Sequence, residues 1–300
     1  MTYIPQEITD AILEQVAGCH ESSDVWRTCA LVSTSFRPYS QKLLFRTIKI
    51  DTAHPSLSRL HAVLEDAPHL ATHVQELTLS ITPRGLTEVL ETLLDTLTRF
   101  TRVTNCTWTE YGVSGPSWEW STENFRMKLY QFLRLPSLAR VVIHGAGPVL
   151  VDFLASCEQL KSLTVNVPSD YVEGSHISIS PAAASVSTTR STPGSGLLEE
   201  LIIHQSRNLE LIHSLTSQSS RLHLSRLRKF TLIRPYGNSN LEEAEIGACQ
   251  QVLDLCADSL EELAFGKDLL IVTLPLSVAA PASHTTSADI SLRQRANGKK

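Results

Sequence analysis

The segment Leu198-Glu-Glu-Leu201-Ile-Ile203 carries the pattern that decides the fold: three apolar residues, of which the first two are separated by two residues and the last two by one. Five more segments repeat it, at Val74-Gln-Glu-Leu77-Thr-Leu79, Leu138-Ala-Arg-Val141-Val-Ile143, Leu160-Lys-Ser-Leu163-Thr-Val165, Leu227-Arg-Lys-Phe230-Thr-Leu232 and Leu260-Glu-Glu-Leu263-Ala-Phe265. The last two apolar positions are spaced as residues on one face of a strand. We interpret each copy as one short strand and predict a degenerate copy at Phe100-Thr-Arg-Val103.

The copies recur at intervals of 22 to 38 residues, which resembles the spacing of leucine-rich repeats with insertions. Apolar stretches between the copies predict helices, at Leu86–Leu97, Asn124–Leu133, Val149–Ala155, Leu209–Leu215 and Leu241–Leu255. A unit of one strand and one helix buries its core only when neighbouring units stack. The predicted fold class is therefore α/β, with an irregular leucine-rich-repeat-like solenoid and a parallel sheet over residues 51–274. The alternative is an ordinary α/β domain whose buried strands look alike.

Residues 1–50 are organised differently. They predict three short helices and a strand, at 5–17, after Ser22-Ser23-Asp24, from Arg37-Pro38 and at Phe45–Ile50. Pro5 suits the first turn of a helix, and Ile8, Ile12 and Val16 form one apolar stripe on it. Because three short helices bury little apolar surface, we expect a partner chain to complete part of it.

Three segments of this region, in this order, resemble the F-box of fungal F-box proteins. They are Ile4-Pro5-Gln-Glu7-Ile8, Cys29-Ala30-Leu31-Val32-Ser33-Thr-Ser35-Phe36-Arg37-Pro38 and Leu44-Phe45-Arg46-Thr-Ile48. Ile4 and Phe36 stand where the family more often has Leu and Trp, and both keep the apolar character. The alternative is an unrelated helical cap on the repeats that follow.

The resemblance implies a protein–protein interface rather than a catalytic site. F-box proteins bind a Skp-family adaptor and through it a cullin, as the substrate-recognition subunits of SCF-type ubiquitin ligases. By position, the resemblance implies six adaptor-binding residues: Ile4, Pro5, Ile8, Ile12, Leu31 and Val32. For Ile12 and Val16, packing among the three helices is an equally good interpretation.

The repeats also depart from the regular leucine-rich pattern. Asn or Cys usually follows the last apolar strand position by three residues, and this chain has other residues there, namely Thr82, Ala146, Pro168, Ser206, Pro235 and Asp268. The array therefore resembles the divergent repeats that follow F-boxes in fungal proteins. We expect a target protein to bind the outward strand positions Thr78, Thr164, Ile202 and Thr231, together with Ala264; a sheet buried on both faces would select the same small residues.

Two segments interrupt the array. Residues 168–196 contain eight Ser, three Thr, three Pro and three Gly, which predicts a disordered loop, and residues 275–300 predict a disordered tail. Between the repeats, Trp108, Tyr111, Trp118 and Trp120 suggest an aromatic loop at 109–122, either as binding anchors or as packing under the solenoid.

Composition limits the other function classes. The net charge is −5, the pI about 6.1, and the basic residues are scattered, so neither nucleic acid nor membrane is the expected partner. The six cysteines are dispersed, and neither a secretory signal nor a membrane-spanning stretch is found in the sequence. These observations predict a cytoplasmic or nuclear protein with reduced cysteines.

No catalytic, cofactor or metal motif is expected to operate. The segment Val141-Val-Ile-His144-Gly145-Ala-Gly147 resembles the oxyanion-hole strand of lipase-like hydrolases, but the sequence has no Gly-x-Ser-x-Gly nucleophile motif. The eleven histidines show no metal-ligand spacing. We therefore expect a non-enzymatic substrate receptor. Two rival hypotheses are an F-box-like scaffold without a role in ubiquitination and a hydrolase built around His144.

Overall fold

Helices open the fold. The computed structural model describes residues 5–19, 23–82, 86–110, 123–145, 159–166, 198–204, 212, 216, 224–233, 243–265 and 270–273. The first helices are α1 (Gln6–Cys19), α2 (Ser23–Val32) and α3 (Arg37–Arg46), as predicted. α2 packs against α3, and Pro38 lies in the first turn of α3, where a missing backbone N–H costs nothing. Among the described residues, no helix combines the length and the apolar character needed to cross a membrane.

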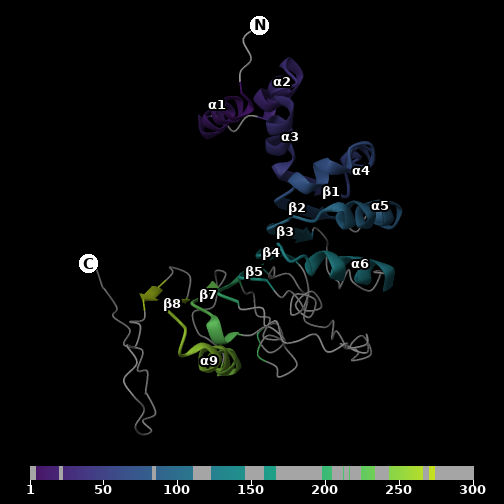
Figure 1. Ribbon diagram of the computed structural model, residues 1–300. Helices are drawn as coiled ribbons and strands as arrows, with labels where there is room; N and C mark the ends of the chain where they lie inside the picture. The colour runs from purple at the N-terminus through teal and green to yellow at the C-terminus, as the bar shows by residue number, and fades with distance from the viewer. Residues whose placement is uncertain are drawn as a thin grey trace, which may run out of the picture.

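One open sheet follows these helices (Figure 1). Its strands are β1 (Thr47–Asp51), β2 (Glu76–Ile81), β3 (Asn105–Glu110), β4 (Arg140–His144), β5 (Ser162–Asn166), β6 (Glu200–His204), β7 (Lys229–Ile233), β8 (Glu262–Phe265) and β9 (Leu270–Thr273). Each strand pairs with the next one in the sequence. β1 to β8 are parallel, and β9 is antiparallel to β8. The α/β class and the parallel pairing are therefore confirmed for β1–β8.

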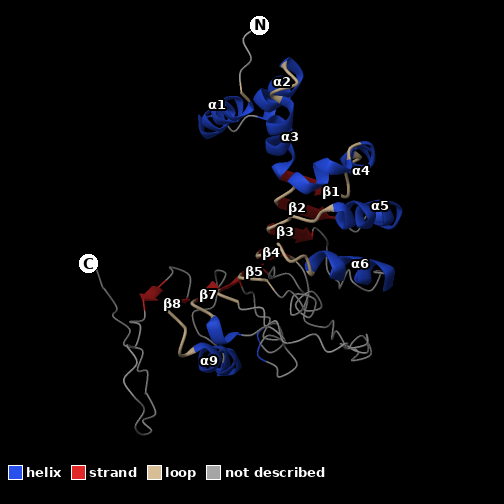
Figure 2. Ribbon diagram, viewed as in Figure 1, coloured by secondary structure: helices blue, strands red, loops and turns tan. Residues whose placement is uncertain are grey.

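Helices cover one face of this sheet, as Figure 2 shows for α4, α5 and α6. The helices after β1 are α4 (Ser56–Asp66), η1 (Pro68–His73), α5 (Leu86–Arg99), α6 (Glu123–Leu133), η4 (Leu224–Arg226) and α9 (Glu243–Cys256). The helices predicted at 86–97, 124–133 and 241–255 are confirmed. The one predicted at 149–155 lies outside the described residues, as does all of 209–215 except Ile212.

The core lies between the strands and these helices. The second and third apolar residues of each predicted copy face it: Leu77, Leu79, Val141, Ile143 and Leu201 are all buried there. The first apolar residue, such as Leu138 or Leu160, is buried too, at the turn before the strand. Each position of the pattern therefore has a packing role.

The units repeat the same backbone contact at their start. The carbonyl oxygen of Gln75 accepts hydrogen bonds from the N–H groups of Thr104 and Asn105, at 2.8 and 3.0 Å. The same double acceptance recurs at the carbonyls of Thr104, Ala139, Lys161, Glu199 and Arg228. In each of these units, one carbonyl thus joins the unit to the next one. The register between units is therefore the same, although the units are irregularly spaced in the sequence.

The degenerate copy predicted at Phe100–Val103 is wrong by three residues. Cys106 pairs with Leu77 and Trp108 with Leu79, so the copy is Val103-Thr-Asn-Cys106-Thr-Trp108. Phe100 and Val103 are buried before the strand rather than in it. Trp108 is accordingly a buried strand residue and not part of a loop, whereas Tyr111, Trp118 and Trp120 lie outside the described residues.

β1 belongs to the sheet as its first strand. Ile48 and Ile50 pair with Leu77 and Leu79, and both are buried. The boundary predicted between residues 50 and 51 therefore falls inside this strand. α3 leads directly into β1 and packs against η1, so the helical segment is continuous with the sheet. The segments 168–196 and 275–300 lie outside the described residues.

Thr82, which follows Leu79, the last apolar residue of its copy of the pattern, by three positions, is paired with Thr52. The N–H of Thr82 donates to Thr52 Oγ1 at 3.0 Å, and the two hydroxyls lie 3.2 Å apart. Thr52 is buried, and its own N–H donates to the carbonyl of Ser80. The hydroxyl of Thr52 thus satisfies the backbone N–H of Thr82 between the first two units.

Candidate interaction surfaces

Four large apolar side chains of α1 and α2 are exposed. The exposed fractions are 52% for Ile8, 53% for Ile12, 84% for Leu31 and 69% for Val32. Pro5, at the start of α1, is exposed as well. Burying a side chain of this size contributes about 1.5–3 kcal/mol, so leaving four of them in water forgoes considerable stabilisation. Where such side chains form one patch, the patch is typical of a surface that another chain covers.

The buried side of α1 is a different one from the stripe predicted in the sequence. Thr9 and Leu13 are buried, and Val16 is half-buried, while Ile8 and Ile12 lie outside this contact. Packing among the helices is therefore not what Ile8 and Ile12 do. Leu13 takes that role because it lies about 100° around the helix from Ile12 and faces the neighbouring helix.

A hydrogen bond from Gln6 joins the start of α1 to the turn after α2. Gln6 Nε2 donates to the carbonyl of Ser35 at 2.9 Å and to Asp10 Oδ1 at 2.8 Å. The turn itself is held by a hydrogen bond from the N–H of Phe36 to the carbonyl of Ser33. Pro5, next to Gln6, and Val32, which ends α2, thus come from two segments that the fold ties together. Ile4 lies outside the described residues.

The second surface is the face of the sheet that points away from the helices. Its middle row runs across the strands through residues that share one register, Lys49, Thr78, Thr107, Val142, Thr164, Ile202, Thr231 and Ala264. Thr78 and Ile202 are partly exposed. The row changes from charged and hydroxylated at β1–β3 to mostly apolar at β4–β8.

Three of the outward positions expected to be exposed are buried, namely Thr164, Thr231 and Ala264. Larger side chains flank them in the same row: Val142 and Ile202 on either side of Thr164, and Ile202 beside Thr231. A small side chain between larger neighbours on a sheet is shielded from solvent, which accounts for part of this burial. The hydroxyls of Thr164 and Thr231 have no hydrogen-bond partner among the described residues.

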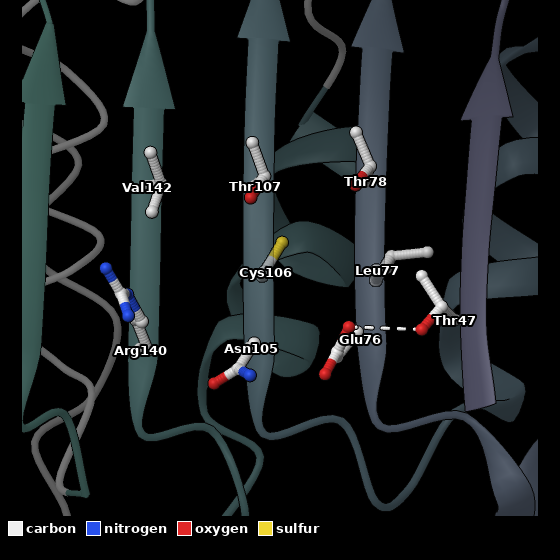
Figure 3. Close-up of a pocket in the computed structure, with 9 residues that line it drawn as sticks. All are labelled: Thr47, Glu76, Leu77, Thr78, Asn105, Cys106, Thr107, Arg140 and Val142. Atoms are coloured by element: carbon white, nitrogen blue, oxygen red, sulfur yellow. Dashed lines mark hydrogen bonds between the residues drawn. The ribbon is translucent and has the colours of Figure 1, made fainter. Parts of the chain in front are cut away.

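A shallow hollow of about 320 Å³ lies over the first four strands of this face (Figure 3). Its outward side chains form two rows. Thr47, Glu76, Asn105 and Arg140 make up the row nearest the strand starts, and Thr78, Thr107 and Val142 the next. Thr47 Oγ1 donates to Glu76 Oε2 at 3.1 Å. The hollow is therefore polar, with one carboxylate and one guanidinium two strands apart.

Further along, the same row becomes a chain of ion pairs. Lys229 Nζ lies 3.6 Å from Glu200 Oε1 and 3.3 Å from Glu262 Oε1, and Ser162 Oγ donates to Glu200 Oε2 at 2.6 Å. Just before the strands, Lys161 pairs with Glu199 at 3.7 Å and Arg228 with Glu261 at 2.6 Å. Charges of opposite sign thus alternate from β5 to β8.

At the other end of the strands, His144, Asn166 and His204 share a row. Asn166 Nδ2 lies 3.4 Å from His144 Nδ1. Burial, and secondarily the nearby His144, lowers the pKa of His204. Histidine, cysteine and acidic side chains of the described residues do not gather in any group of three that could hold a metal ion. His144 Nδ1 thus lies within hydrogen-bonding distance of a side-chain amide, and Thr109 is the register neighbour of His144 on β3.

The sequence matches no protein-family model and no curated protein.

Proposed function

We propose that this chain is a substrate receptor of an SCF-type ubiquitin ligase. The helices α1–α3 act as an F-box that binds a Skp-family adaptor and through it a cullin. The sheet, as a leucine-rich-repeat-like solenoid, binds a target protein. The chain itself contributes no catalytic residue. It raises the effective concentration of a target lysine near the charged ubiquitin-conjugating enzyme.

The exposed apolar side chains of α1 and α2 carry this proposal. Ile8, Ile12, Leu31 and Val32 are four of the positions that the resemblance implies for adaptor binding, and all four are exposed while Leu13 and Trp26 fill the interior. Leu31 and Val32, at 84% and 69%, are also more exposed than the large apolar side chains that are exposed on the helices covering the sheet, such as Ile246 at 51%. An apolar partner surface would bury them and recover the stabilisation that they forgo.

Co-purification of the full chain with a recombinant Skp-family adaptor and cullin tests the proposal. The variant combines Ile8→Asp with Leu31→Asp. A charge in a desolvated apolar interface costs several kcal/mol, so we expect adaptor affinity to fall at least 100-fold. The melting temperature should stay within about two degrees, because both side chains are already exposed.

Ile246→Asp is the matched control. Ile246 lies on α9 with 51% of its side chain exposed, close to the value for Ile8, and far from α1 in the sequence. This variant should bind the adaptor like the wild type. If wild type and the double variant bind equally, α1 and α2 are not the docking surface. Ubiquitin chains on a co-purified protein separate a receptor from a scaffold that binds the adaptor without delivering targets.

A further inference from the structure

Arg140, which lines the hollow over β1–β4, differs from Lys161, Arg228 and Lys229 at the starts of other strands in having no carboxylate partner among the described residues. Lys161, Arg228 and Lys229 each lie within 4 Å of a carboxylate on a neighbouring strand or the turn before it. Arg140 occupies the same row as Lys229 and is exposed, but forms no ion pair or hydrogen bond within the described part of the chain. In Figure 3 the side chain of Arg140 lies along β4, and its guanidinium is on the side away from Asn105, its register neighbour on β3.

Asn105, the neighbour of Arg140 on β3, is also unengaged. Its side-chain amide has no partner in the described ranges, and it lies between Arg140 and Glu76 in the row. Glu76 receives a hydrogen bond from Thr47 on one oxygen, which leaves the other oxygen open. The ion pairs that join the charges of this row over β6–β8 therefore have no counterpart over β3 and β4.

We infer that this hollow binds an extended peptide segment of the target protein. An Asp or Glu side chain of that segment pairs with the guanidinium of Arg140, and a backbone amide of the segment forms hydrogen bonds with the side chain of Asn105. The inference rests on the proposed function and specifies the class of target segment. A guanidinium holds a carboxylate through two parallel hydrogen bonds, and a side-chain amide offers both a donor and an acceptor to a peptide group.

Strand spacing defines the length of the segment. Arg140 and Glu76 are two strands apart, which is roughly 9.5 Å at the usual strand separation, or about three residues of extended chain. The open oxygen of Glu76 therefore accepts a donor about three residues from the acidic side chain. Thr78 and Thr107 add hydroxyls along the path, and Val142 adds an apolar contact.

Charge balance favours a carboxylate over a phosphate. Only one cation, Arg140, lines the hollow in the part of the chain that the structure describes, and Glu76 lies two strands away. A phosphoserine carries about two negative charges at pH 7, which one guanidinium near a carboxylate does not neutralise.

Selection from a phage-displayed library of random 12-residue peptides, with the full chain as bait, tests the inference. The wild type should enrich peptides with one acidic residue and a basic or polar residue about three positions away. Arg140→Glu should lose these peptides and enrich basic ones. Arg59→Glu, an exposed change on α4 outside the hollow, should select the same peptides as the wild type.

Titrations with an enriched peptide give the magnitudes. Arg140→Ala should weaken binding roughly 10-fold to 100-fold, and Asn105→Ala roughly 5-fold, as expected for one charge-assisted and one neutral hydrogen-bonding contact. Replacing the peptide's acidic residue with Gln should match the loss in Arg140→Ala. Tighter binding of a phosphoserine peptide would overturn the assignment of a carboxylate.

Adaptor binding of the same proteins separates this inference from the proposed function. If the wild type binds the adaptor but enriches no acidic peptide, or if Arg140→Glu enriches the same peptides as the wild type, the inference is wrong and the function stands. If acidic peptides are enriched but no adaptor binds, the peptide site stands and the proposed function is wrong.

Discussion

Glu110 is an ionisable residue at a strand position where the neighbouring residues on the same face are apolar. It ends β3, pairs with Ile81 in the register, and faces the helix side of the sheet like Cys106 and Trp108. Its Oε2 is buried with no hydrogen-bond partner in the described residues, and burial raises the pKa of this carboxyl to about 7. Its backbone oxygen would lie 2.7 Å from a Cβ at Gly145, whose φ of 86° also requires glycine.

This carboxyl should make stability depend on pH. In the unfolded chain Glu110 loses its proton near pH 4.5, whereas in the folded protein it keeps the proton up to about pH 7. The folded state binds more protons between these values, so its stability is full below pH 4.5 and falls as the pH rises through 7. The loss is about 1–2 kcal/mol once the partial exposure of the side chain is considered.

Glu110→Gln should remove this dependence. Glutamine has the same shape and no charge, so at pH 8 the variant should be more stable than the wild type by about 1–2 kcal/mol, and at pH 4.5 the two should agree within about 0.5 kcal/mol. Urea unfolding at both pH values measures the difference. An equal offset at both values would show that the carboxyl is solvated in the folded protein.

Apolar character alone could not predict which residues of the first helices are buried and which are exposed. Ile8, Ile12 and Leu13 are all apolar, and a helical projection allows either Ile12 or Leu13 to face the neighbouring helix. Only the packing of α1 against α3 shows that Leu13 is the buried one. Likewise, period-two alternation predicted the outward direction of Thr164 and Thr231 but not their burial, which depends on neighbours from other strands.

At the scale of elements, every strand pairs with the next one in the sequence, including strands whose residues depart from the aliphatic pattern that predicted the sheet. The copy in β3 escaped the pattern because its two inward residues are Cys106 and Trp108 rather than aliphatic. β1 also carries the pattern, as Phe45-Arg-Thr-Ile48-Lys-Ile50, with the 29-residue offset that joins Thr47 to Glu76. Buried position, and not aliphatic identity, is what the sheet requires of these residues.

The alternating charges of Glu200, Lys229 and Glu262 on β6, β7 and β8 should contribute to the register of these strands. In Lys229→Glu, three carboxylates would occupy neighbouring strands in one row, with Glu200 and Glu262 on either side. We expect a loss of about 1–2 kcal/mol of unfolding free energy at low salt, because both attractions become repulsions. Raising the salt to 1 M should reduce that loss by more than half.

Lys229→Gln and the pair Lys229→Glu with Glu262→Lys are the controls. The first removes the attraction without adding repulsion and should cost less than the charge reversal. The second restores one pair of opposite sign and should recover part of the loss. Equal losses for the single charge reversal and the restored pair would mean that packing of the Lys229 stem, rather than its charge, stabilises this row.

At the scale of the whole molecule, contacts run between consecutive units, from β1 through β9. In such an arrangement, the stability depends on each unit's contact with its neighbours, and chain that contributes no core residue to a unit can be shortened. The α/β class and the sequence order of the strands follow from this repetition, which is why a local pattern was enough to predict them. The segments between units vary in length without altering the register.

Replacing residues 168–196 tests whether the pairing of neighbouring strands is independent of the length of the segment between them. β5 ends at Asn166 and β6 begins at Glu200, and the two strands are paired in parallel from Ser162 opposite Glu200 onward. A parallel crossover needs about a dozen residues, and loop-closure entropy changes by only about 0.6 kcal/mol per doubling of length. Replacing 168–196 with a 12-residue Gly/Ser linker should therefore shift the melting temperature by no more than a few degrees.

The same replacement at α6 is the contrasting variant. α6 places Leu129, Phe132 and Leu133 in the core, so exchanging residues 123–133 for Gly and Ser should remove several kcal/mol and unfold the sheet around β3 and β4. Thermal unfolding of both variants decides the matter. A fall of ten degrees or more on replacing 168–196 would show that this segment packs on the sheet, and that β5 and β6 depend on it as β3 and β4 depend on α6.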